Sequence, residues 1–268
     1  MSILIAGHYC HDTLLSTSGT HRALGGSAAY ASAILAALGE PFEVAAKVGT
    51  DFLYAAEVLR PPRVVAESTV SFVDDYREGE RRARVEAVCE PLWPDDLRGE
   101  FEVGMACGIA GEVLPETLAR MRSLCRVMTA DAQGLLREIS PQGEVRLRPL
   151  HPDAAAQLDY LKASRREAQL LDLPALRKRL TLLITEGPLG CALLTAGEEH
   201  HLPAFEALEK DPTGAGDCFL AGFAAGLARG LSPLRAARIG AYCGARAVEQ
   251  VGVPRLTKEQ ARAALESA

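Results

Sequence analysis

The chain has 268 residues, and 48% of them are hydrophobic, so it holds enough apolar material for the core of one large domain and shows no compositional sign of disorder. Its 35 acidic residues outnumber 29 lysines and arginines, and this net charge of −6 argues against nucleic acid or an anionic membrane as a partner. The apolar start at 3–6 is too short for a signal sequence and no run of about 18 apolar residues follows, so we expect a cytoplasmic protein.

Strand-like and helix-like segments alternate along the chain. A strand is predicted at 2–7 and an alanine-rich helix at 27–38. Further apolar runs predict strands at 43–47, 103–106, 126–130, 158–162, 180–185 and 191–195. Helical patterns lie at 115–124, 165–171, 215–227 and 233–250, and a capping box of Thr257 and Gln260 opens the last helix. This alternation predicts an α/β fold with a mostly parallel central sheet flanked by helices.

Two β-rich segments interrupt this alternation. Residues 68–76 and 81–89 are joined by 77–80, which predicts a projecting β-hairpin lid at about 68–89 on a single domain spanning 1–268. Arginines and acidic residues are interleaved in it, so a solvated, charge-balanced lid is favoured over a nucleic-acid surface. The seven cysteines include no Cys-x-x-Cys pair and predict reduced, buried thiols.

The most informative segment is 211–217, which runs directly into an apolar helix. Gly214, Ala215 and Gly216 let successive backbone NH groups turn toward one point, next to the positive end of the helix, which makes an anion cradle. Asp217 stands at its mouth, where a carboxylate can take a proton from a hydroxyl that attacks phosphorus. By itself, Gly-x-Gly-Asp is also an ordinary loop before a helix with an acidic first turn.

The longer pattern Asp-x-Thr-Gly-Ala-Gly-Asp-x-Phe-x-x-Gly, from Asp211 to Gly222, resembles the signature of ribokinase-like (PfkB) carbohydrate kinases. The whole chain can be followed through the family pattern. The resemblance implies a ribokinase-like fold and transfer of the γ-phosphoryl group of ATP to an alcohol, with Mg²⁺ bridging the phosphates. It implies Thr213 as a nucleotide contact, and it leaves open a monovalent cation such as K⁺ and a homodimer through the β lid.

Two features near the start of the chain are similar to the acceptor site of this family. Gly25 and Gly26 precede a helix, where close backbone approach would leave space for the substrate. Asp12 follows the first strand at the carboxyl end of the sheet and could accept hydrogen bonds from two adjacent hydroxyls, which we favour over a turn-forming role. His8 and His11 lack a third ligand for zinc.

The donor site is expected in the second half of the chain. Ser164 replaces the asparagine of the family's Asn-x-x-Glu, and Glu167 is the candidate acid of the metal shell, although it could equally cap a helix. Thr185, Gly187 and Gly190 resemble the Thr-x-Gly-x-x-Gly turn along the nucleotide, although hairpin glycines need no function.

Small residues on the penultimate helix would face the adenine, although small residues often serve packing alone. They are Ala241, Cys243, Gly244 and Ala247.

Several stretches resemble the plant-type myo-inositol kinases within the family: 7–12, 47–52, 108–117, 131–133, 161–164 and 211–213. An uncharged ring of hydroxyls suits carboxylates, so Glu112 is a further substrate-binding candidate, and Gln133 or Arg137 is expected near the transferred group. Polyol sites share these residue types across substrates, so a sugar or nucleoside kinase of the same family stays an alternative. A non-catalytic small-molecule sensor is the other alternative, and the intact cradle with Asp217 argues against it.

Overall fold

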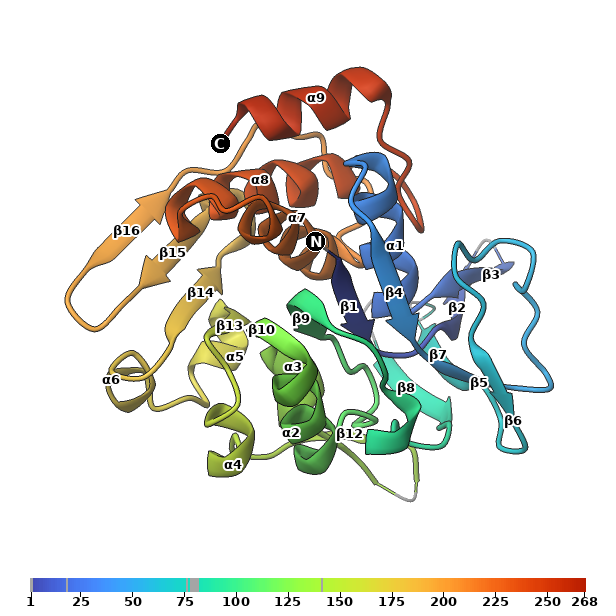
Figure 1. The fold of residues 1–268 in the computed structure, drawn as a ribbon. Coiled ribbons are helices and arrows are strands. Elements are labelled where there is room, and N and C mark those ends of the chain that lie inside the picture. Colours follow the sequence, from blue (N-terminus) through green and yellow to red (C-terminus); the bar gives the residue numbers. More distant parts are fainter. Residues whose placement is uncertain (1, 18, 76, 78–81, 141) are drawn as a thin grey trace.

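The computed structural model describes residues 2–17, 19–75, 77, 82–140 and 142–268 (Figure 1). An eight-stranded sheet forms its centre, in the order β16-β15-β14-β13-β10-β9-β1-β4. Neighbouring strands from β4 to β14 are parallel, and β15 and β16 add an antiparallel edge. The strands are β1 (Ile3–Ala6), β4 (Phe42–Ala45), β9 (Phe101–Ala106), β10 (Cys125–Asp131), β13 (Tyr160–Ser164), β14 (Thr181–Thr185), β15 (Cys191–Leu194) and β16 (Glu199–Leu202).

Helices cover both faces of this sheet. One face carries α1 (Ser27–Ala37), α7 (Ala215–Ala228), α8 (Pro233–Ala247) and α9 (Lys258–Glu266). The other carries α2 (Pro115–Leu124), α3 (Ala132–Leu136), α4 (Pro152–Ala155), α5 (Arg165–Ala168) and α6 (Leu173–Leu176). Strand β1 shows the reason, because Ile3 and Ile5 enter one core while Leu4 and Ala6 enter the other. The predicted α/β fold with a mostly parallel sheet is confirmed.

Local signals located most helix ends well. Helix α2 spans the predicted 115–124, and α9 has the predicted capping box, with Gln260 N donating to Thr257 Oγ1 (3.1 Å) and Thr257 N to Gln260 Oε1 (2.9 Å). Helix α5 ends at Ala168, short of the predicted 171. All seven cysteines are free thiols, as predicted. Within the described residues, no helix has the length and apolar character needed to cross a membrane.

A smaller sheet projects from the central one, in the order β3-β2-β7-β8. Strands β7 (Val70–Asp75) and β8 (Arg82–Ala87) form the predicted antiparallel pair, and the loop at 76 and 78–81 lies outside the described residues. Strands β2 (Cys10–Ser16) and β3 (Gly19–Gly25) form a second hairpin that the sequence analysis missed. We call these four strands the lid sheet; Asp12 belongs to it, and does not simply follow β1 as predicted.

The remaining elements are short. Strand β5 (Lys47–Gly49) pairs with β6 (Arg63–Val65), and β11 (Arg137–Ile139) pairs with β12 (Val145–Leu147). Two single 3₁₀ turns, η1 (Pro94–Asp96) and η2 (Gly187–Leu189), complete the described part.

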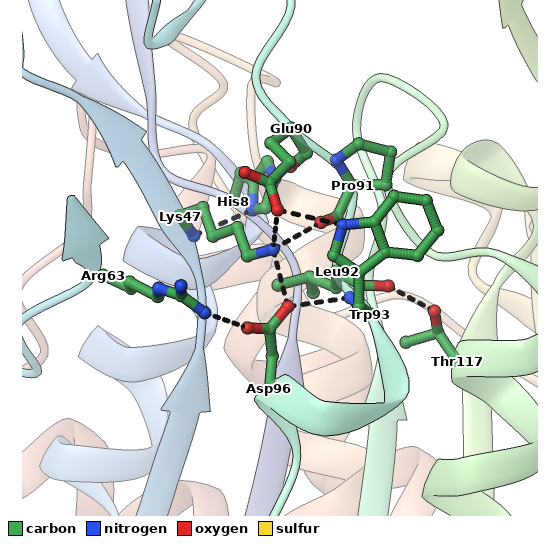
Figure 2. A network of polar contacts seen from close by, with 9 residues as sticks. All are labelled: His8, Lys47, Arg63, Glu90, Pro91, Leu92, Trp93, Asp96 and Thr117. Atoms are coloured by element: carbon green, nitrogen blue, oxygen red, sulfur yellow. Dashed lines mark hydrogen bonds and ion pairs between the residues drawn. The ribbon is translucent and has the colours of Figure 1, made fainter. Parts of the chain in front are cut away.

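A buried polar network ties segment 90–96 to the strands beside the lid sheet (Figure 2). The ammonium of Lys47, 1% exposed, contacts Glu90 Oε1 and Asp96 Oδ2, both at 2.6 Å, and donates to the carbonyl of Pro91 (2.8 Å). Arg63 pairs with the other oxygen of Asp96 at 2.7 Å. All three hydrogens of the Lys47 ammonium thus have an acceptor.

His8 belongs to the same network and follows β1 directly. Its Nδ1 accepts from the backbone NH of Lys47 (3.1 Å), so Nε2 carries the proton and donates to the carbonyl of Glu90 (2.9 Å). Both ring nitrogens of His8 therefore have hydrogen-bond partners within the protein. The network fixes the chain at the carboxyl end of β1.

We predict that Lys47→Met lowers the free energy of unfolding by about 3 kcal/mol, because Asp96 and Glu90 lose their buried counter-ion. Urea denaturation followed by circular dichroism measures this. Arg63→Gln is the matched control: Arg63 contacts the same Asp96 but is 68% exposed, and its loss should cost less than about 1 kcal/mol. Equal losses in the two variants would contradict the dominant role given to Lys47.

Candidate active site

The cradle at 214–217 requires glycine at two positions. Gly214, which precedes α7, has a φ of +72°, and a Cβ there would lie 2.1 Å from the ring of Tyr30. A Cβ at Gly216 would lie 2.3 Å from Nζ of Lys162. Tyr30 thus lies against the cradle at Gly214 and Lys162 lies against it at Gly216, so only glycine fits at these two positions.

The amide groups of the cradle are available to a ligand. Helix α7 begins its α-helical bonding with Cys218 N to Gly214 O (2.9 Å), and Ala215 N donates to Pro212 O (3.3 Å). Gly216 N and Asp217 N have no acceptor within the part of the chain that the structure describes. Unpaired NH groups at a helix N-terminus favour an anion, so this loop fits a phosphoryl group.

Asp217, in the first turn of α7, has the properties of a reactive carboxylate. It is half-buried and forms no hydrogen bond or ion pair with the described residues. Burial raises its pKa to about 7; Asp131 and Asp12 act in the same direction, while Lys162 and Arg137 oppose them. A carboxylate with this pKa can take up a proton near neutral pH, as a general base must.

Lys162 and Asp131 form an ion pair that the sequence analysis did not identify as functional. They are register partners, Lys162 in the middle of β13 and Asp131 at the carboxyl end of β10, and Nζ lies 2.9 Å from Asp131 Oδ2. Both side chains are buried. Burial lowers the pKa of Lys162, but Asp131, Glu167 and Asp217 outweigh it, so the pKa is raised and the ammonium stays charged. Charged residues inside otherwise apolar strands were the available sequence signal.

The predicted acceptor residues lie together, but the glycines have a different cause from the one expected. A Cβ at Gly25 would lie 1.9 Å from Oδ2 of Asp12, and one at Gly26 would lie 2.4 Å from the carbonyl oxygen of His8. The space is therefore filled by protein groups, and Gly25 admits the Asp12 carboxylate. The thiol of Cys10 donates to Asp12 Oδ1 (3.1 Å), which helps to orient it.

The other predicted substrate contacts have protein partners. The carboxylate of Glu112, 3% exposed, accepts from the backbone NH groups of His8 (3.0 Å), Ile109 (2.9 Å) and Ala110 (2.8 Å). Glu112 thus holds two loops together, and its role as a substrate ligand stays a prediction. The backbone NH of Gln133 donates to Oδ1 of Asp131 (3.0 Å), which caps the N-terminus of α3. Arg137 donates to the carbonyl of Ile109 (3.1 Å) and acts electrostatically on Asp217.

Glu167 caps α5 and keeps one oxygen for other ligands. Its Oε2 accepts from Ser164 N (2.7 Å), and Ser164 Oγ accepts from Glu167 N (3.3 Å), which is the capping box considered as the alternative. Oε1 has no partner among the described residues. Among the described residues, no group of three or more His, Cys, Asp or Glu side chains could hold a metal ion.

The residues of the predicted nucleotide turn lie beside β14. Thr185 Oγ1 donates to Ala163 O at 3.4 Å, and Gly187 has open space where a side chain would stand. Gly190 has a φ of +100°, and a Cβ there would meet the carbonyl of Leu202 at 2.0 Å. Gly190 thus has a structural cause. Gly187 has one as well, because its φ is +57°, and the space beside it is open.

Two of the four predicted adenine contacts lie in the protein core, and the other two, Ala241 and Gly244, are half-buried. Cys243 and Ala247 of α8 are 0% and 2% exposed and belong to the core over α7. Gly244, on the same helix, stays half-buried, and Thr213 in the loop before α7 is exposed. The packing alternative describes the first two residues, and a nucleotide-facing role for any of them stays a prediction.

The structure therefore unites five charged residues around the cradle. They come from the lid sheet, three further strands and the start of α7: Asp12, Asp131, Arg137, Lys162 and Asp217. The carboxyl ends of the parallel strands meet there, which is where ligands bind in such folds. Unpaired amides for a phosphoryl group stand beside carboxylates for hydroxyls, so the site suits phosphoryl transfer to an alcohol.

Comparisons with known proteins agree with this chemistry. The family described as pfkB family carbohydrate kinase matches residues 90–259. An inositol 3-kinase of Zea mays is 43% identical over 276 residues, covering 94% of this chain and 73% of that protein.

Two solved structures share the fold. A pyrophosphate-dependent kinase in the ribokinase family, complexed with a pyrophosphate analog and myo-inositol, gives a TM-score of 0.81 at 19% identity and covers 97% of this chain and 99% of that one. A ribokinase of Arabidopsis thaliana, complexed with ribose and ATP, gives 0.77 at 17% identity over 98% of both chains.

We predict that Asp217→Asn stabilises the protein at pH 8 by about 2 kcal/mol, because the folded state no longer holds a buried charge. The folded-state pKa lies above the ordinary aspartate value of 3.8, so ionising Asp217 costs stability progressively as the pH rises from about 4 to 7. Denaturant unfolding at pH 8 and 5.5 measures the effect. The gain should be smaller at pH 5.5; a gain independent of pH would contradict the raised pKa.

Proposed function

Because this chain belongs to the pfkB family of carbohydrate kinases, we propose that it transfers the γ-phosphoryl group of ATP to a hydroxyl of a polyol, most specifically myo-inositol. The observation that carries the proposal is the Asp217 carboxylate, unpaired among the described residues and with a pKa near 7 at the mouth of the cradle. Beside it, Asp12 offers a second carboxylate for the hydroxyls of the acceptor.

In the proposed reaction, Asp217 takes the proton of one acceptor hydroxyl as its oxygen attacks phosphorus. The amides of Gly216 and Asp217 hold the phosphoryl oxygens and stabilise the charge that develops there. They are fixed before the donor arrives, so little free energy goes into reorganising them. The bond from the γ-phosphorus to its leaving oxygen breaks, and ADP departs.

The donor site is proposed along η2 and the start of α5. Gly187 would leave room for the nucleotide, and Oε1 of Glu167, which has no partner among the described residues, would hold a metal-bound water. Mg²⁺, when bound, neutralises charge on the donor phosphates. Stimulation by K⁺, the homodimer through the lid sheet and the cytoplasmic location stay predictions.

Relatives support myo-inositol as the acceptor. The Zea mays relative is named an inositol 3-kinase, and one structural neighbour was solved with myo-inositol. A cyclitol presents adjacent hydroxyls and carries no charge. A carboxylate such as Asp12 can therefore bind it better than a cationic side chain, because the carboxylate accepts hydrogen bonds from the hydroxyls.

We predict that Asp217→Asn lowers kcat by roughly two to four orders of magnitude, the usual contribution of a positioned base, while KM for Mg-ATP changes little. Wild-type activity should fall as the pH drops below about 7, because the carboxylate takes up a proton. The assay is coupled ADP release from pH 5.5 to 9. A variant that retains most of its turnover would remove Asp217 from the role of base.

We predict that kcat/KM for myo-inositol exceeds the values for ribose, fructose and adenosine. Asp12→Ala should lower kcat/KM for myo-inositol at least tenfold, because a carboxylate–hydroxyl contact contributes about 1.5 to 3 kcal/mol, and it should spare KM for ATP. The control Glu86→Ala removes a carboxylate from the same lid sheet, 45% exposed and paired with Arg84, and should change neither value.

The four acceptors are assayed with Mg-ATP and with pyrophosphate, because one structural neighbour is described as pyrophosphate-dependent. A higher kcat/KM for ribose or adenosine would overturn the inositol assignment within the family. Tight binding of one compound without turnover would instead favour a sensor.

A further inference from the structure

A buried ion pair lies directly behind the cradle. Nζ of Lys162 is 2.9 Å from Oδ2 of Asp131, and the two side chains are 7% and 4% exposed. The same ammonium lies where a Cβ at Gly216 would approach within 2.3 Å, so nothing separates it from the cradle backbone. No water layer therefore screens its charge on that side.

The pair is not explained by the stability of the sheet. Two charges buried in neighbouring strands lose their hydration, and apolar side chains of similar volume would hold β10 and β13 together at least as well. Lys162 also has only one acceptor, Asp131, among the described residues, which leaves two of its three N–H donors without a described partner. An incompletely paired buried ammonium points to a role outside the sheet.

We propose that Lys162, held by Asp131, is a positioning residue that adjusts the charge of the catalytic centre: its ammonium acts through Gly216 on the Asp217 carboxylate and on the phosphoryl group in the cradle. This inference rests on the proposed function. Asp131 fixes the ammonium in place and partly cancels its charge, so the two residues act on Asp217 in opposite directions. Without Lys162, Arg137 would be the remaining positive charge among the described groups that act on Asp217, and it would face the carboxylates of Asp12, Asp131 and Asp217.

The described groups that act electrostatically on Asp217 are partly charged and partly neutral. The charged ones are Asp12 of β2, Asp131 of β10, Lys162 of β13 and Arg137 of β11, and Glu167 acts on Lys162. The neutral ones are thiols and a phenol whose pKa values burial raises further: Cys10, Cys107, Cys218 and Tyr30. The neutral groups stay protonated at the working pH, so the balance at Asp217 is set by the charged ones.

The test compares Lys162→Met, Asp131→Asn and the double variant. Asparagine retains a side-chain oxygen for the Gln133 amide that Asp131 caps. The pH profile of kcat/KM is measured from pH 5.5 to 9 with myo-inositol and Mg-ATP. The acidic limb should move to higher pH by about one unit in Lys162→Met and to lower pH in Asp131→Asn, because a unit charge a few ångströms away changes a pKa by this order.

In the double variant the limb should return to within about 0.5 pH unit of wild type, because the removed charges cancel. Its kcat should stay reduced about tenfold or more, because the cradle lacks the ammonium. Lys178→Met, which removes an exposed lysine, is the matched control and should leave both the limb and kcat unchanged. If Lys162→Met fails to fold, Asp131→Asn and the double variant still decide between the outcomes.

A merely structural pair would lower stability without opposite movements of the limb. Limbs that move in the same direction, or do not move, would overturn the proposal. A second readout is independent of turnover: the pKa of Asp217, followed by carbon NMR of protein with labelled aspartate, should move in the same opposite directions. If wild type phosphorylates none of the acceptors while these movements occur, the proposed function fails and the electrostatic role stands.

Discussion

The charge balance at the carboxyl edge of the large sheet is the constraint on which the site depends. Parallel strands bring their carboxyl ends to one edge, and this places Asp131 and Lys162 beside the first turn of α7. The lid sheet adds Asp12 from outside the central sheet. Burial, followed by repulsion from Asp131 and Asp12, raises the pKa of Asp217 to about 7, while Lys162 and Arg137 keep it from rising further. A base useful at neutral pH results from these opposed contributions, none of which is local in sequence.

The features that were predictable from sequence are those with local causes. The cradle requires glycine at 214 and 216 for steric reasons, and the capping box of α9 lies within four residues. The apolar strands follow from burial on both faces of the sheet. In contrast, the hairpin of β2 and β3 has mixed polarity, with exposed residues at 19–22, and it gains its order from pairing with β7. Such non-local pairing leaves no simple periodic signal.

Some of the predicted site residues have structural contacts that the sequence did not indicate. Gly25 was predicted to leave space for the substrate, and the structure puts the Asp12 carboxylate there. Glu112 was predicted to bind hydroxyls, and its oxygens accept from backbone amides on both sides of the site. A motif indicates which residue type is compatible with a position. Whether that residue contacts a ligand or another part of the chain depends on the tertiary structure.

Two lysines are buried among the described residues, and their hydrogen-bond partners distinguish a structural charge from a functional one. Lys47 and Lys162 are both nearly inaccessible, and in sequence each is a single lysine in an apolar strand. The three hydrogens of the Lys47 ammonium all have acceptors, in Glu90, Asp96 and the carbonyl of Pro91 (Figure 2). The charge of Lys47 therefore has a structural role, because it holds segment 90–96 in place. Lys162 has one acceptor among the described residues, Asp131, and its ammonium lies beside the backbone of Gly216. An incompletely paired ammonium in a low-dielectric site exerts a strong electric field, so the charge of Lys162 remains available to a phosphoryl group in the cradle. The free-energy cost of burying Lys162 is then explained by the chemistry at the cradle and not by folding.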